Sequence, residues 1–122
     1  MKTTHRKAVE AYLTLVKLSD VRRAPATQIK LFKLKKLLQP SFEFTGEEEK
    51  KLIEELGGVA DDLGKVTFQK TEDLVQYNRE RVKLLDLECE VDLEKKMTVH
   101  SEELKEISLA EMEALETFID FV

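Results

Sequence analysis

The sequence contains two imidazoles and one thiol that could form a nucleophilic pair or a metal cluster: His5, His100 and Cys89. A nucleophilic cysteine needs a neighbouring base, and a zinc site needs cysteine and histidine ligands at short intervals. The chain contains no C-x-x-C or H-E-x-x-H pattern, and Cys89 lies on the apolar side of an alternating segment, where thiols usually serve as packing groups. We therefore expect no catalytic residue, no metal site, no cofactor and no enzymatic activity.

The glycines do not form a phosphate-binding loop. Gly57, Gly58 and Gly64 are not followed by Lys-Ser or Lys-Thr, and no G-x-S-x-G motif is present. The sequence therefore favours a protein that acts through its surfaces.

One acidic segment has a regular pattern. From Leu87 to Glu94, apolar and acidic residues alternate, which is typical of a half-buried strand. Its outer face carries a row of carboxylates that suits a divalent cation, a basic partner or plain solvent: Glu88, Glu90 and Asp92. The pattern leaves open whether this strand pairs with residues 66–69, with residues 97–99 or with another chain.

Charge is divided along the chain. Residues 1–42 carry a net charge of +8, residues 43–85 carry −4 and residues 86–122 carry −9, which sum to the overall −5. Opposite ends of such a chain can neutralise each other within one fold or between subunits, or each can face a separate partner.

The basic end contains the helix around which the other elements are expected to pack, residues 25–38. At about 100° per residue, one line of this helix is apolar and the opposite line is cationic. The apolar line consists of Thr27, Leu31, Leu34 and Leu38, with Ile29 and Phe32 on its flank. The cationic residues proposed as contacts are Arg22, Arg23, Lys30, Lys33 and Lys36. A protein partner fits this face better than nucleic acid, because the whole chain is acidic and no helix-turn-helix spacing is present.

A helix is predicted on each side of this one. Thr3 or Thr4 can cap a first helix that ends near Leu18. Its predicted buried face consists of Val9, Tyr12, Leu13 and Val16, packed on residues 31, 34 and 38 of an antiparallel second helix. Pro40 should stop or kink the second helix, and residues 41–44 should form an extended bridge. Thr45 and Glu48 then have the spacing of a capping box for a third helix that ends at Gly57.

The remaining elements are shorter. Val66 and Phe68 indicate a short strand, and Thr71 should begin a helix to about Leu85. Its predicted inward residues are Leu74, Val75, Val82 and Leu85, with Asn78 on the same face, bonded to a neighbouring backbone or placed in the interior for a role. Residues 94–96 can turn the chain into a hairpin strand at 97–99. Ser108 and Glu111 form a second capping box, followed by a last amphipathic helix with Met112, Leu115, Phe118 and Ile119 inward.

These elements predict the fold class: α+β and mainly α-helical, with an antiparallel amino-terminal helical pair, further helices and a small two- or three-stranded β element. The length suits a single domain, 1–122, and one cysteine excludes an internal disulfide. No segment is apolar enough to span a membrane, and the charged start does not resemble a signal peptide, so we expect a cytoplasmic protein.

Four segments resemble a family of short uncharacterised proteins encoded by phages and prophages of Gram-positive bacteria, a domain of unknown function. They are KLFKLKKL, EEEKKLIEEL, YNRERVKLLDLECEVDL and ISLAEMEALETFIDF. The resemblance implies a small phage accessory protein in the host cytoplasm, or one associated with the virion. It implies no site residues.

The sequence thus predicts a non-enzymatic phage accessory protein with a structural or assembly role. Its partner would be a phage or host protein, or a second copy in a homo-oligomer, and neither nucleic acid nor a membrane is expected. The alternative is an inhibitor whose acidic surface occupies the basic groove of a host defence or nucleic-acid-processing enzyme.

Overall fold

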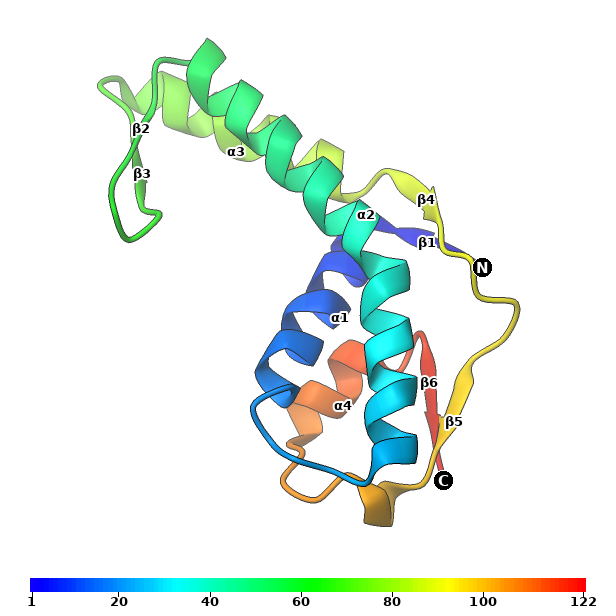
Figure 1. The fold of residues 1–122 in the computed structure, drawn as a ribbon. Coiled ribbons are helices and arrows are strands. Elements are labelled where there is room, and N and C mark those ends of the chain that lie inside the picture. The colour runs from blue at the N-terminus through cyan, green and yellow to red at the C-terminus, as the bar shows by residue number, and fades with distance from the viewer.

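A computed structural model describes residues 1–122 and shows a body from which a helical arm projects (Figure 1). Its helices are α1 (His5–Leu18), α2 (Pro25–Glu55), α3 (Thr71–Leu85) and α4 (Leu109–Leu115), with a short 3₁₀ helix at Ser101–Glu103. The fold is α+β and mainly helical, as the sequence predicts. The body holds α1, the first half of α2 and α4, whereas the second half of α2 and α3 form the arm.

Helix α1 begins where the sequence predicts, but it buries a different face. Thr4 caps it, and its hydroxyl accepts a hydrogen bond from the backbone N–H of Lys7. The buried residues are Ala8, Ala11, Leu15 and Leu18, whereas Leu13 and Val16 are exposed and Val9 and Tyr12 are only half-buried. The prediction of the face was therefore wrong. Two alanines let the backbones of α1 and α2 approach closely, which the bulkier Val9–Leu13 stripe would not allow.

Helix α2 packs on α1 through the apolar line that the sequence predicts. In Figure 1 the chain descends along α1, and after the connection at 19–24 it rises along α2. Residues 27, 31, 34 and 38 are all buried, and the three leucines among them belong to the main core, confirming that prediction. Thr27 is polar, and its hydroxyl donates a 2.7 Å hydrogen bond to the Glu103 carboxylate.

The helix does not stop at Pro40, so the predicted bridge at 41–44 and the separate third helix were wrong. Thr45 does not act as a cap, because its hydroxyl donates instead to the backbone carbonyls of Ser41 and Phe42. Pro40 is exposed, which leaves its ring room on the solvent side. The proline lacks the N–H that would bond the carbonyl of Lys36, and such a gap bends a helix. Figure 1 shows α2 changing direction between its cyan and green halves.

Helix α3 has the predicted bounds but not the predicted orientation. Its buried side chains are Tyr77, Leu84 and Leu85, whereas Leu74, Val75 and Val82 are 41%, 51% and 49% exposed. Asn78 is also exposed, so it is neither an interior residue nor bonded to a neighbouring backbone. Only Leu85 of the predicted face is buried, because α3 meets α2 through its other side.

Three separate two-stranded sheets replace the single small β element that was predicted. Strand β1 (Lys2–Thr4) pairs antiparallel with β4 (Glu88–Glu90), so the acidic segment is a strand, but it pairs neither with residues 66–69 nor with residues 97–99. Strands β2 (Val59–Ala60) and β3 (Val66–Thr67) form a hairpin on the arm. The strand at residue 66 was predicted, whereas its partner at residues 59–60 was not.

The third sheet joins β5 (Met97–Val99) and β6 (Ile119–Phe121) in parallel. The predicted hairpin through residues 94–96 is therefore wrong, although 97–99 is a strand. The capping box of Ser108 and Glu111 is confirmed. Helix α4 ends at Leu115, and the chain becomes extended because its last residues bond to β5. Leu115, Phe118 and Ile119 are buried as predicted.

No helix in the structure is both long enough and apolar enough to cross a membrane.

Candidate functional site

Of the predicted cationic residues, two form hydrogen bonds with the backbone and three remain exposed. Arg23 donates hydrogen bonds from Nη1 to the backbone carbonyls of Leu18 and Val21, at 2.5 and 3.0 Å, and so closes the carboxyl end of α1. Lys30 donates to the carbonyl of Thr98 at 2.9 Å. These two cations hold the fold together, and only Arg22, Lys33 and Lys36 remain as exposed cations of the set.

The predicted acidic row is also divided. Glu90 forms a 3.1 Å ion pair with the amino terminus of Met1, whereas Glu88 and Asp92 are exposed and make no ion pair. Glu90 and Asp92 line one cleft together with Lys36. Predicted acids and a predicted cation therefore line one cleft of a single chain, without an ion pair between them.

This cleft, of about 350 Å³, also brings together the imidazole of His5 and the thiol of Cys89. The pairing of β1 with β4 sets Thr3 opposite Cys89, and His5 follows directly as the first residue of α1. Ser41 on α2 contacts both side chains: its Oγ lies 2.6 Å from His5 Nδ1, and its hydroxyl is hydrogen-bonded to the thiol. Sequence spacing gives no sign of this cluster, because the residues are 36 or more positions apart and were expected in unrelated segments.

The electrostatics of the cluster do not favour nucleophilic attack. Burial raises the pKa of the Cys89 thiol, the hydrogen bond from Ser41 opposes that rise, and the Glu90 carboxylate adds to it. Burial also lowers the pKa of His5. At neutral pH the thiol therefore stays protonated and the imidazole stays neutral. No group of three or more His, Cys, Asp or Glu side chains is placed to hold a metal ion.

We expect His5 to make folding sensitive to mild acid. Its pKa in the folded protein lies below the ordinary value of 6.5, so the unfolded chain takes up a proton first as pH falls. The free energy of unfolding should decrease from pH 6.5 down to the lowered pKa. The measurement is urea unfolding of the wild type and of His5→Gln at pH 7.5 and 5.0. Between these pH values the variant should lose less free energy of unfolding than the wild type. His100→Gln is the control because that imidazole is exposed, and an equal loss in both variants would contradict the assignment.

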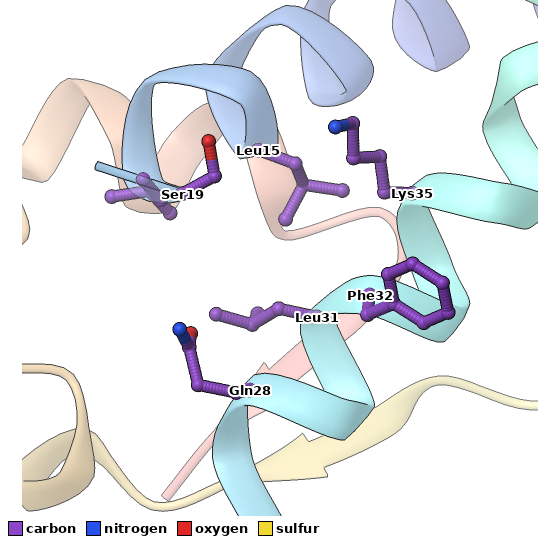
Figure 2. A pocket seen from close by; sticks show the side chains of 7 residues that line it. Leu15, Ser19, Gln28, Leu31, Phe32 and Lys35 are labelled. Carbon is purple, nitrogen blue, oxygen red and sulfur yellow. The ribbon is translucent and has the colours of Figure 1, made fainter. Parts of the chain in front are cut away.

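The second candidate site is an apolar groove of about 250 Å³ between α1 and α2. Figure 2 shows Leu15 of α1 and Leu31 of α2 pointing toward one another across it. Leu18 and Phe32 complete its apolar lining, and its polar residues are Ser19, Gln28 and Lys35. Phe32 is 59% exposed, although it is the largest side chain at the groove.

Lysines border this groove. The ammonium group of Lys36 lies 5.6 Å from the centre of the Phe32 ring, and that of Lys35 lies 6.0 Å from the centre of the Tyr12 ring. Lys33 is also exposed, but it lies on the opposite line of α2 from Leu31 and does not line the groove. The groove therefore combines an apolar floor with a positively charged edge.

Sequence reasoning identified part of this groove. It placed Phe32 on a flank of the helix and the lysines beside it, but it missed the contribution of α1, because Leu15 and Leu18 were not on the predicted buried face. The signal that was available is the pair Ala8 and Ala11, which lies on the same side of α1 as Leu15 and Leu18.

Comparisons of this chain with protein-family models, curated proteins and solved structures find no match.

Proposed function

We propose that this protein acts by binding another protein, without catalysis, and that the groove between α1 and α2 is its docking site. The observation that supports this most is Phe32, an aromatic side chain that is 59% exposed beside an apolar groove. Leaving such a ring in water is unfavourable, whereas aromatic anchors seated in apolar pockets contribute much of the energy of protein interfaces.

The partner proposed for the groove is an acidic amphipathic helix. Its apolar residues would fill the space above Leu15 and Leu31, in the manner of a helix bound in a groove. Its carboxylates would lie near Lys35 and Lys36, and residues 1–42 carry a net charge of +8 that would steer such a partner. A phage or host protein can supply this helix.

A pair of synthetic peptides tests the docking site. Both form amphipathic helices with leucines on one face, and the polar face carries glutamates in one peptide and lysines in the other. We expect the acidic peptide to bind, to shift the amide NMR signals of Leu15, Leu18 and Leu31, and to bind more weakly in high salt. Phe32→Ala should weaken binding by about 1–3 kcal/mol, and Lys35→Glu should also weaken it.

The matched control is Leu63→Ala, which removes a 94% exposed side chain on the loop between β2 and β3 and should leave binding unchanged. Equal loss in Leu63→Ala and Phe32→Ala would contradict the groove as the docking site. Binding of the lysine peptide in place of the acidic one would favour the alternative function, an inhibitor that presents its acidic surface to a basic groove.

The role proposed for this binding is that of a phage or prophage accessory protein in structure or assembly. Its support is the resemblance of the four segments described above. Gene neighbourhood tests it: a position among head and tail genes agrees with assembly, whereas a position among early genes agrees with inhibition of a host enzyme.

A further inference from the structure

The arm leaves one side of α3 uncovered, and this side has the spacing of a helix–helix contact. Thr71, Val75, Asn78, Val82 and Leu85 follow one another at intervals of four, three, four and three residues. This is the repeat by which two helices keep one seam in contact. The first four of these residues are exposed, and α2 and the β2–β3 hairpin lie against the other side, where Tyr77 contacts Phe68. Nothing in the chain buries these four residues, whereas Leu85 is already buried.

Charges beside the seam favour an antiparallel copy of the same helix. Glu72 lies next to the seam in the first turn of α3, and Arg79 lies next to it two turns later; neither forms an ion pair within the chain. Two antiparallel copies of α3 bring Glu72 of each near Arg79 of the other, giving two attractive contacts. A parallel arrangement instead brings Leu74 near Arg79 and loses both of these contacts.

Asn78 lies at the middle of the seam. Its amide carries both donors and an acceptor, so it favours a partner surface that has polar groups of its own. A buried asparagine would be unfavourable against a purely apolar partner surface.

We propose that α3 is a self-association surface, through which two copies of the protein form an antiparallel dimer. Each copy has one arm, consisting of α3 and the second half of α2 (Figure 1). In the proposed dimer the two arms lie together as four helices. The Arg81–Glu49 ion pair at 3.0 Å holds α3 on α2 within each arm and leaves the seam free. This inference uses a surface separate from the groove of the proposed function.

Charge reversal provides the sharpest test. Glu72→Arg places two arginines at each contact and Arg79→Glu places two glutamates there, so each variant alone should raise the dimer dissociation constant about tenfold or more. A mixture of the two variants restores both attractive contacts in the antiparallel dimer. We therefore expect sedimentation velocity of the full chain to show a dimer for the wild type and for the mixture, and mainly monomer for each variant alone.

The apolar part of the seam is tested by the double variant Val75→Glu/Val82→Glu. It should be monomeric with an unchanged helical circular dichroism signal, because both side chains are exposed in the single chain. Phe32→Ala, in the separate groove, should remain dimeric. A wild type that stays monomeric up to millimolar concentration, a dimer that persists in the double valine variant, or a mixture that fails to associate would each overturn the proposal.

Discussion

Replacing Phe118 with alanine is expected to lower the free energy of unfolding by about 3–5 kcal/mol, the usual cost of removing a buried phenylalanine. Phe118 is fully buried and is the largest such side chain in the protein. It lies between α4 and β6, and its carbonyl accepts a hydrogen bond from the backbone N–H of Met97. Phe118→Ala keeps this backbone hydrogen bond but removes the buried ring, so it should weaken the packing of the carboxy-terminal segment on the core. Urea unfolding followed by circular dichroism measures the effect.

Leu109→Ala is the matched control, because Leu109 lies at the other end of the same segment and is exposed. It should change the free energy of unfolding by about 0.5 kcal/mol or less. A small effect of Phe118→Ala, close to that of Leu109→Ala, would mean that the last residues do not belong to the core. If Phe118→Ala fails to fold, Phe118→Leu can be measured instead, and it should lower the free energy of unfolding by a smaller amount.

The sequence predicts the helices of this protein better than the faces that they bury. The bounds of α1 and α3 follow from threonine at the start and from apolar spacing, both of which are local signals. The buried face depends on which neighbour each helix meets. On α1 two apolar stripes compete, and the alanine stripe is buried because it allows close contact with α2. On α3 the more regular stripe, with Val75 and Val82, remains outside.

The strand pairing and the clefts could not be predicted from the sequence either, because both depend on contacts between distant segments. Strand β1 has three residues and no alternating pattern, yet it is the partner of β4 and brings His5 to Cys89. Strand β6 continues an amphipathic helical pattern, but backbone hydrogen bonds with β5 outweigh local helix propensity there. The lysines of the groove were predicted from one helix alone. Its apolar floor was not, because it depends on contact between two helices.

Pro40 was predicted to end a helix, but α2 continues through it. We expect replacement of this proline to stabilise the protein. Pro40→Ala restores the N–H that can bond the carbonyl of Lys36 and removes the clash of the ring with the preceding turn. A proline inside a helix costs about 3 kcal/mol relative to alanine. Because proline also restricts the unfolded chain, we expect a smaller net gain in the free energy of unfolding, about 1–2 kcal/mol.

Gly46→Ala on the same helix is the control for helix propensity alone. A Cβ at Gly46 meets nothing within 4 Å, and the gain should be about 0.5–1 kcal/mol. A larger gain for Pro40→Ala than for Gly46→Ala would show that the missing hydrogen bond limits the stability of α2. A loss of stability in Pro40→Ala would contradict the prediction. It would mean that the bend in α2 is itself required, because the bend sets Ser41 against His5 and Cys89 and directs the arm away from the body.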